Sequence, residues 1–311
     1  MRCLVLGGGG FLGAHLVSKL LAAGHQVVSY GRHASYQNLI SEGLDISCVT
    51  GDFSTENRWN EMLEGVQVCY HLISTTHPKS SNLDPIADVS GNVLGTLRLL
   101  EAARNYSVRI VFTSSGGTVY GLVDDGLISE KHSTNPLCSY GITKLSIEKY
   151  LRLYNELHGV KSIILRIANA YGEGQRIDSP QGAVAVFMGR VLRGHTIDLW
   201  GDGSVVRDYV YVKDIVNAML FASEYGGRSS IFNIGSGVGT SLEELLHLIE
   251  RVTGQEADVV HHPSRGFDVP VNVLDIQKAR DELGWIPQTS LLDGLRNSEK
   301  WMRRQLSISE S

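Results

Sequence analysis

Three glycines near the start of the chain constrain its fold more than any other feature. Gly7, Gly10 and Gly13 have the spacing G-x-x-G-x-x-G, directly after a short strand pattern at Arg2–Leu6 and at the start of a helical pattern over Phe11–Ala23. The first glycine permits a tight turn, the second lets backbone approach a pyrophosphate, and the third permits close packing of helix on strand. Because a helix N-terminus also offers unpaired N–H groups, the pattern predicts a dinucleotide site.

Strand and helix patterns alternate after this turn, which predicts parallel strands joined by right-handed crossovers with helices on both faces. The expected fold is α/β, a Rossmann-like doubly wound parallel sheet with a smaller interwoven α/β substrate lobe. We expect residues 1–168 plus about 208–234 to form the dinucleotide-binding domain, and about 169–207 plus 235–311 to form the lobe. The expected strands are Gln26–Tyr30, Ser47–Val49, Val68–Ile73, Arg109–Ser114, Lys161–Arg166 and Ile231–Ile234. The expected helices are Asn92–Arg104, Tyr140–Leu157, Val184–Arg193, Asp214–Ser223, Leu242–Thr253 and Ile276–Leu283, with fraying from about Leu306.

Composition excludes several classes of protein. A net charge of −5 argues against nucleic acid or an anionic membrane as the main partner. No apolar run is long enough to cross a bilayer, and four scattered cysteines without a Cys-x-x-Cys pattern favour reduced thiols in the cytoplasm. The adjacent histidines His261 and His262 would point to opposite faces of a strand, so no metal site is expected.

The end of the second strand bears on the choice of cofactor. An acidic residue there would bind the adenosine ribose and disfavour a 2′-phosphate, but this chain has Gly31-Arg32. Arg32 could pair with the 2′-phosphate of NADP or be a solvated surface residue. Asp52, after the third strand, could meet the adenine amine.

Tyr140 and Lys144 are four residues apart on a predicted helix and therefore share a face. A cation beside a phenol favours the phenolate and lowers its pKa, which would make the tyrosine usable as an acid and base near neutral pH. Beside a dinucleotide, this pair predicts hydride chemistry at a carbon that bears a hydroxyl.

Several ordered segments resemble the extended short-chain dehydrogenase/reductase family, and within it the NAD-dependent epimerase/dehydratase group. Its UDP-glucose and UDP-N-acetylglucosamine 4-epimerases are the nearest in pattern, and the resemblance covers nearly the whole chain. The matching segments are 7–13, Asn-Val-Leu-Gly-Thr at 92–96, 114–121 ending in Val-Tyr-Gly, Leu-Arg-Ile-Ala-Asn at 165–169, Gly-Asp-Gly at 201–203, Arg-Asp-Tyr-Val-Tyr-Val at 207–212, Phe-Asn-Ile-Gly at 232–235 and Leu-Gly-Trp-x-Pro at 283–287.

The resemblance implies a role for each matching residue. Tyr140 would be the acid and base, and Lys144 would hold the ribose and tune Tyr140. Asn169 would meet the sugar nucleotide, and the guanidinium forks of Arg207 and Arg265 would grip its diphosphate. The implied cofactor residues are Gly7, Gly10, Phe11, Leu12, Gly13, Arg32, Asp52, Phe53, Leu72, Ser74, Asn92, Tyr140 and Lys144. The implied substrate residues are Asn169, Arg207, Arg265, Asp268 and Asn272.

One position departs from the family pattern. The family usually has Ser or Thr five residues before the glycine of Val-Tyr-Gly, and this chain has Gly116 there. Ser115 or Thr118 could supply the missing hydroxyl, and we favour Ser115.

The same segment bears on the reaction. Dehydratases of the group carry an Asp-Glu pair where this chain has Gly117-Thr118, so dehydration is disfavoured for want of a general acid. C4 epimerisation with retained NAD is the favoured reaction. The alternatives are an NADP-dependent nucleotide-sugar 4-ketoreductase and, in another class, a non-catalytic dinucleotide-binding sensor or scaffold. Asn272 stands where relatives that exclude N-acetyl sugars have Tyr, which favours tolerance of a C2 acetamido group. The resemblance also implies a homodimer formed through Asn92–Arg104 and Tyr140–Leu157.

Overall fold

The computed structural model describes residues 1–32, 46–123, 126–178, 182–228, 230–264 and 269–309. A sheet of seven parallel strands forms its centre, in the order β10-β6-β5-β4-β1-β2-β3. These strands are β1 (Arg2–Leu6), β2 (Gln26–Gly31), β3 (Ser47–Thr50), β4 (Val68–His71), β5 (Arg109–Ser115), β6 (Ser162–Ile167) and β10 (Ile231–Ile234). The strand order reverses between β1 and β4, and in such sheets ligands bind at the carboxyl ends of the strands beside that point.

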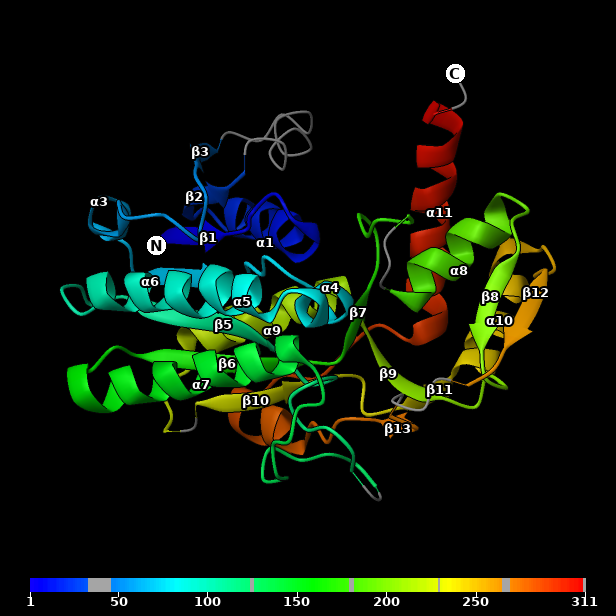
Figure 1. Ribbon diagram of the computed structural model, residues 1–311. Helices are drawn as coiled ribbons and strands as arrows, with labels where there is room; N and C mark the ends of the chain where they lie inside the picture. Colours follow the sequence, from blue (N-terminus) through cyan, green and yellow to red (C-terminus); the bar gives the residue numbers. More distant parts are fainter. Residues whose placement is uncertain (33–45, 124–125, 179–181, 229, 265–268, 310–311) are drawn as a thin grey trace.

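Helices cover both faces of this sheet, which explains why β4 and β6 are buried along their whole length. One face packs against α1 (Phe11–Ala22), α9 (Val212–Glu224) and the π-helical turn η3 (Ala279–Leu283). The other packs against α3 (Trp59–Leu63), α6 (Gly95–Ala103) and α7 (Ser139–His158). The chain reaches α6 through α4 (Pro78–Leu83), α5 (Pro85–Asp88) and the π-helical turn η2 (Val89–Leu94). Figure 1 shows α5, α6 and α7 side by side on the front of the sheet.

A smaller lobe stands beside the carboxyl ends of the strands (Figure 1). Its strands are β7 (Asn169–Tyr171), β8 (Ile197–Trp200), β9 (Val206–Tyr211), β11 (Gly239–Ser241), β12 (Val259–His262) and β13 (Val271–Asn272). Its helices are α8 (Ala183–Leu192), α10 (Leu242–Thr253) and α11 (Leu291–Ser309), which pack around one apolar core. β9 pairs with β7, β11 and β13, so it is the central strand of this sheet.

The doubly wound sheet and each predicted helix are present, with ends shifted by a few residues. The residues from Leu306, which were expected to fray, are helical as far as Ser309, where α11 ends. Sequence patterns missed α11 altogether, and they also missed the short strands of the smaller lobe. Within the described residues no helix is both long and apolar enough to cross a membrane.

Candidate active site

Backbone packs on backbone at the glycine turn. Gly7 has φ +87° and its N–H donates to the Tyr30 carbonyl, 2.7 Å away. A Cβ on Gly13 would lie 2.0 Å from the Gly7 carbonyl oxygen, so no larger residue fits between α1 and β1. Gly10 is the N-cap of α1 and brings no side chain to the first N–H groups. The helix N-terminus is therefore left for an anion.

The side chains of Phe11 and Leu12 turn away from this anion position. Both pack against the apolar core of the smaller lobe. Any contact they make with a pyrophosphate would therefore come from their backbone N–H groups.

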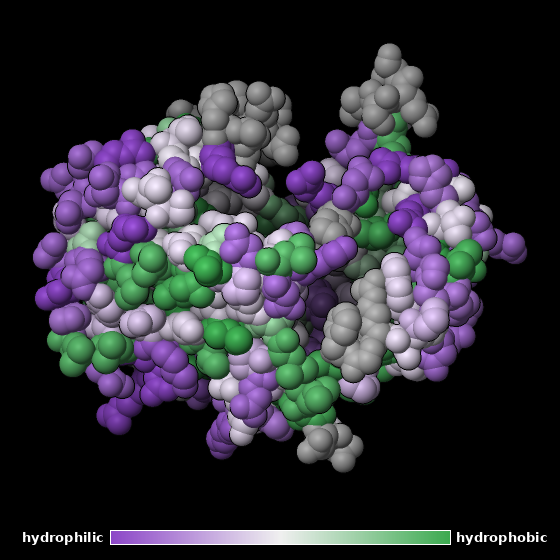
Figure 2. Space-filling model, in the orientation of Figure 1, coloured by the Kyte–Doolittle hydropathy of each residue, from purple (hydrophilic) through white to green (hydrophobic). Residues whose placement is uncertain are grey.

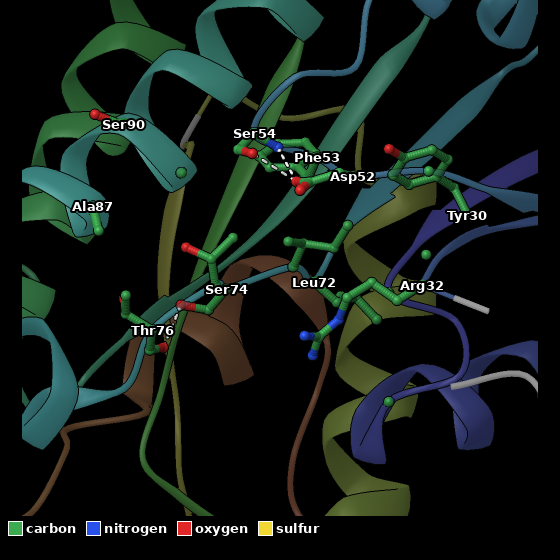
Figure 3. A pocket seen from close by; sticks show the side chains of 17 residues that line it. Tyr30, Arg32, Asp52, Phe53, Ser54, Leu72, Ser74, Thr76, Ala87 and Ser90 are labelled. Carbon is green, nitrogen blue, oxygen red and sulfur yellow. Dashed lines mark hydrogen bonds between the residues drawn. The ribbon is translucent and has the colours of Figure 1, made fainter. Parts of the chain in front are cut away.

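A cavity of about 610 Å³ opens beside the glycine turn (Figure 3). Its volume lies within the usual range for small-molecule sites. The lining residues are Gly7, Gly10, Tyr30, Gly31, Arg32, Gly51, Asp52, Phe53, Ser54, Leu72, Ile73, Ser74, Thr75, Thr76, Ala87, Ser90 and Gly91. The cavity thus brings together most of the residues predicted to hold a dinucleotide.

Arg32 and Asp52 lie at one end of this cavity. Figure 3 shows the Arg32 guanidinium directed into the cavity. The Asp52 carboxylate accepts hydrogen bonds from Ser54 N at 2.8 Å and Ser54 Oγ at 2.7 Å, which lower its pKa; the Arg32 charge adds to the effect. The described residues at the end of β2, Gly31 and Arg32, are not acidic, as the sequence indicated.

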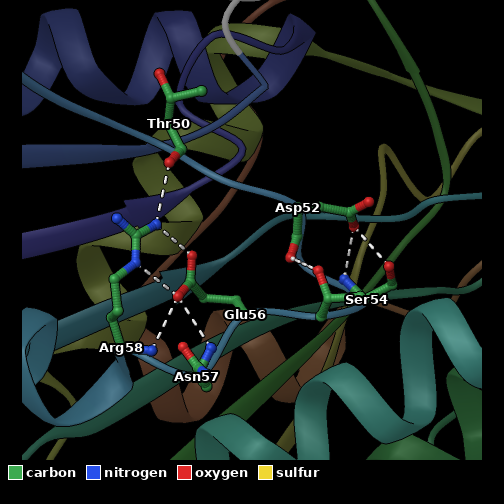
Figure 4. A network of polar contacts seen from close by, with 7 residues as sticks. Thr50, Asp52, Ser54, Glu56, Asn57 and Arg58 are labelled. Atoms are coloured by element: carbon green, nitrogen blue, oxygen red, sulfur yellow. Dashed lines mark hydrogen bonds and ion pairs between the residues drawn. The ribbon is translucent and has the colours of Figure 1, made fainter.

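The loop after β3 that presents Asp52 is held by a second carboxylate (Figure 4). Glu56 accepts two hydrogen bonds from the Arg58 guanidinium, at 2.9 and 2.6 Å, and Arg58 also donates to the Thr50 carbonyl. These bonds lower the pKa of Glu56 to about 2 despite its burial. The loop is therefore fixed by charge-assisted hydrogen bonds.

Tyr140 and Lys144 lie one turn apart on α7, beyond Ser74 of the cavity wall. The Lys144 side chain is buried, its Nζ donates to the Thr113 carbonyl at 2.9 Å, and Nζ is 5.6 Å from the centroid of the Tyr140 ring. Tyr140 is half-buried, and Ser74 of the cavity wall is close enough to its phenol to oppose part of the rise in its pKa. The pair thus lies at the edge of the dinucleotide cavity.

The expected lowering of the Tyr140 pKa is wrong for this structure. Burial raises the pKa of Tyr140, the Cys138 thiol and the Asp88 carboxylate add to the rise, and only the Ser74 bond opposes it. Burial also lowers the pKa of Lys144 to about 8, while Asp88 and Glu148 oppose that change. Desolvation therefore outweighs the attraction between phenolate and ammonium.

Residues 115–118, called the hydroxyl segment below, begin with the last residue of β5. Ser115 is partly exposed, whereas Thr118 Oγ1 is buried and has no hydrogen-bond partner among the described residues. Gly116 does not have positive φ; a Cβ there would lie 2.5 Å from Leu274 Cδ1. Space, not backbone conformation, excludes a side chain at this position.

Three of the five predicted substrate residues lie on strands of the smaller lobe. Asn169 is half-buried on β7 and its Nδ2 donates to the Asp208 carbonyl at 3.0 Å. Arg207 on β9 donates to the Val206 and Val269 carbonyls. Asn272 is 2% exposed and pairs with Arg207 in register across β13 and β9. Arg265 and Asp268 lie outside the described residues.

Sequence patterns missed a buried carboxylate, Asp88, that orders this region. Its oxygens accept hydrogen bonds from Ser139 and Thr143 of α7, both at 2.7 Å, and from Thr76 of the cavity wall. Asn92 is also buried, and its amide bonds to Asp88, Thr75 and Thr76 rather than facing the cavity. Asn92 therefore shapes the lining. No sequence motif marks Asp88, because its partners come from three separate segments.

A buried histidine was missed as well. The His71 ring lies 5.0 Å from the Phe53 ring and 5.1 Å from the Phe112 ring, and Lys144 Nζ lies 4.7 Å from the Phe112 centroid. Burial, with the charge of Lys144, lowers the pKa of His71 to about 3, so the imidazole is neutral. A series of ring contacts through Phe53, His71 and Phe112 thus joins the cavity to Lys144. No cluster of three metal-binding side chains is found in the part of the chain that the structure describes.

Comparison with known proteins agrees with this geometry. The model of the NAD dependent epimerase/dehydratase family matches residues 3–235. A UDP-glucose 4-epimerase of Mycolicibacterium smegmatis is 38% identical over 98% of this chain and 99% of its own. A dTDP-4-dehydro-6-deoxyglucose reductase of Escherichia coli is 35% identical over 96% of this chain and 97% of its own.

Two solved structures superpose closely on the chain. The UDP-glucose 4-epimerase of Thermotoga maritima, crystallised with UDP-glucose, is 36% identical with a TM-score of 0.92, covering 98% of this chain and 100% of its own. The Thermus thermophilus UDP-glucose 4-epimerase, crystallised with NAD, is 33% identical with a TM-score of 0.90, covering 97% of this chain and 99% of its own.

Proposed function

Because the chain belongs to the NAD-dependent epimerase/dehydratase family, we propose that it is a nucleotide-sugar C4 epimerase. Its substrate is a UDP-linked hexose or N-acetylhexosamine, and its cofactor is NAD. The proposal rests on the placement of Tyr140, which lies one helical turn from Lys144 on α7 and beside Ser74 of the dinucleotide cavity. The resemblance to epimerases crystallised with UDP-glucose and with NAD supports both ligands.

The residues of the cavity fit a dinucleotide. The glycine turn brings bare backbone to the start of α1, which suits a pyrophosphate. Ser74 and Thr76 line the part of the wall that leads to Tyr140, and Asp52 and Phe53 line the opposite end. Bound NAD would supply the acceptor for the hydride from C4 of the sugar and the donor that returns it to the other face.

The chain itself moves the proton and holds the reacting groups. Tyr140 accepts the proton of the C4 hydroxyl as the 4-keto sugar forms. It returns the proton after the 4-keto sugar has rotated to present its other face. Lys144, anchored to Thr113, supplies a positive charge beside Tyr140 and bonds to the ribose. Dehydration is disfavoured, because no carboxylate follows Gly116.

We assign the hydroxyl beside Tyr140 to Ser115 rather than Thr118. Both residues are partly exposed, but Ser115 Oγ, unlike Thr118 Oγ1, is not among the buried polar atoms without a partner, so it can meet a substrate. Thr118 Oγ1 is buried, and reaching the sugar would require the segment to rearrange. Replacing each with Ala separates the two: Ser115→Ala should lower kcat and Thr118→Ala should not. The reverse order would contradict the assignment.

On the substrate side, Arg207 and Arg265 would bind the diphosphate and Asn169 the sugar nucleotide, with Asp268 and Asn272 nearby. In this division residues 1–168 plus about 208–234 bind the dinucleotide, and the remainder binds the substrate. The helix α9 supports a boundary near this point, since it packs under the large sheet directly after β9 of the smaller lobe.

A 4-ketoreductase is the second candidate. Arg32 at the cavity suits a 2′-phosphate, and one relative is a nucleotide-sugar reductase. The cofactor that copurifies distinguishes the two: an epimerase retains NAD because it regenerates it in each turnover, whereas a reductase exchanges NADPH. Denaturing the purified protein and identifying the released dinucleotide is the test. Stoichiometric NAD supports the epimerase, and an empty protein that binds NADPH supports the reductase.

We propose that the protein acts as a homodimer in the cytoplasm, in the synthesis of polysaccharide precursors. Exposed apolar side chains on the front helices support the dimer: Ile142, Leu153 and Leu157 on α7 are 53%, 43% and 66% exposed, and Val89 and Leu94 on η2 are each 43% exposed. Figure 2 shows apolar surface gathered over α5, α6 and α7. The molar mass from light scattering should be twice 34.0 kDa and should halve in Leu153→Glu. A monomeric wild type would contradict the dimer.

A further inference from the structure

The smaller lobe reaches into the hydroxyl segment through the stretch 272–274. Asn272 Nδ2 donates a hydrogen bond to the Gly116 carbonyl at 3.2 Å. The Leu274 side chain fills the space where a side chain of residue 116 would stand, with Cδ1 at 2.5 Å and Cδ2 at 3.1 Å from a Cβ built there. Leu274 is completely buried, so its side chain can move aside only by displacing its packed neighbours, and the Arg166 carbonyl oxygen lies 3.2 Å from the same Cβ. Gly116 is therefore fitted to Leu274.

The stretch 272–274 is itself firmly held. Leu274 N donates to Asp208 Oδ2 at 3.2 Å, and Ile128 bonds to its neighbours, donating to the Val273 carbonyl and accepting from Asp275 N, both at 2.9 Å. Leu274 also belongs to a small apolar cluster with Val119 and Tyr120, which follow the hydroxyl segment directly. These contacts fix the position of Gly116 from the side of the smaller lobe.

The same stretch is continuous with the strands expected to bind substrate. Asn272 pairs with Arg207 in register, and Asp208, the next residue of β9, holds Leu274. A shift of β9 on binding a diphosphate would therefore be transmitted to Gly116. We infer that Asn272 and Leu274 are positioning residues that hold Ser115 in its place beside Tyr140. This inference rests on the proposed function. The fit of Gly116 against Leu274 then compensates for the missing hydroxyl at residue 116, because it positions the hydroxyl of Ser115 instead.

The first test exchanges volume between the two sides of the contact. Gly116→Ser should lower kcat by about 10-fold or more, although it restores the hydroxyl usual in the family, because the new side chain meets Leu274. The double variant Gly116→Ser with Leu274→Ala should recover at least ~3-fold of that loss, since neighbouring sites are not additive. Gly226→Ser is the matched control, because a Cβ on Gly226 meets nothing within 4 Å; its kcat should not change. A fully active Gly116→Ser, or a double variant no better than the single one, would overturn the inference.

The second test separates positioning from contact with the sugar. Asn272→Leu keeps the volume but cannot donate to Gly116, so kcat should fall about 10-fold while KM and NAD affinity change by less than ~3-fold. If KM changes while kcat stays constant, Asn272 acts on substrate binding and the positioning role is wrong. Urea unfolding of the variants at residues 116 and 274 gives a double-mutant cycle that does not depend on turnover. If the wild type is inactive but the stability changes at residues 116 and 274 are coupled, the proposed function alone is refuted. If the two stability changes are additive, the contact between Gly116 and Leu274 is refuted.

Discussion

The Lys144 ammonium donates a hydrogen bond to the Thr113 carbonyl, 2.9 Å away, and so ties α7 to the end of β5. Ser115 follows Thr113 by two residues and Tyr140 precedes Lys144 by one helical turn. Together with the hydrogen bond from Ser114 of β5 to Glu148 of α7, this bond fixes the proposed acid and base relative to the hydroxyl segment. It also explains why a lysine, rather than a smaller residue, is needed beneath the tyrosine.

Removal of the Tyr140 hydroxyl tests the proposed acid and base. Tyr140→Phe should lower kcat by about 10²–10⁴-fold, the usual contribution of a positioned proton-transfer group, while NAD still binds. Tyr150→Phe, on the same helix but at the surface, is the matched control and should keep full activity. Turnover assays together with the content of bound cofactor provide the check. Retained activity in Tyr140→Phe would refute the mechanism.

The buried Lys144 predicts how activity depends on pH. Because its pKa is lowered to about 8 in the ligand-free protein, its proton is lost as pH rises through that value. If the protonated amine is the active form, kcat/KM, which reports the free enzyme, should fall above about pH 8. A profile that stays flat to pH 10 would show that the Lys144 charge is not needed.

Glu148 offers a way to shift this pH profile. Its carboxylate lies one turn after Lys144, accepts hydrogen bonds from Arg166 and Ser114, and opposes the fall of the Lys144 pKa. Glu148→Gln should therefore move the basic limb to lower pH. Because the change leaves the buried Arg166 uncompensated, we expect it also to cost about 3–5 kcal/mol of stability. An unmoved limb in a folded variant would argue that Lys144 is not the titrating group.

Glu56 should stabilise the fold in a pH-dependent way. Its pKa falls from 4.5 unfolded to about 2 folded, mainly because Arg58 bonds to it, so its contribution is complete above the unfolded value and is lost as pH falls from about 4.5 towards 2. At pH 7 Glu56→Gln should cost about 1–3 kcal/mol in urea unfolding. The difference from wild type should shrink below pH 5. Asp178→Asn, in an exposed pair with Arg193, is the control and should change little. A constant difference between pH 7 and 4 would contradict the role of the charge.

The choice of sugar should depend on residue 272. Asn272→Tyr should lower turnover of UDP-N-acetylhexosamines relative to plain UDP-hexoses by about 10-fold or more, because the larger ring takes the space of the acetamido group. The ratio of the two activities is the quantity to measure, since loss of the bond to Gly116 should slow both. An unchanged ratio would refute this hypothesis.

Local patterns predicted the features that lie within one segment of the chain. The glycine turn, the parallel strands and the pair on α7 each depend on spacing within a few residues, and the structure shows each of them. Asp88, His71 and Leu274 could not be predicted in this way, because each makes its contacts with residues far away in the sequence. The pKa of Tyr140 also depends on how deeply the folded chain buries it, which spacing does not indicate.

The end of the chain illustrates another limit of sequence patterns. The helix α11 carries many charged residues on its exposed face. Only a few of its residues, such as Leu295 and Met302, are buried. Its apolar side is recognisable only against α8 and α10, which complete the core of the smaller lobe. Tertiary packing, more than local preference, therefore establishes this helix.

The most direct test follows hydrogen at C4 of the sugar. We propose incubating the purified protein with C4-deuterated UDP-galactose or UDP-N-acetylgalactosamine, without added cofactor, and identifying the products by NMR and mass spectrometry. Epimerisation through a 4-keto sugar should convert each sugar to its C4 epimer, with deuterium retained at C4 and no net formation of NADH. Failure to convert either sugar without NADPH, together with stoichiometric NADPH consumption on a 4-keto sugar, would contradict it and identify a reductase.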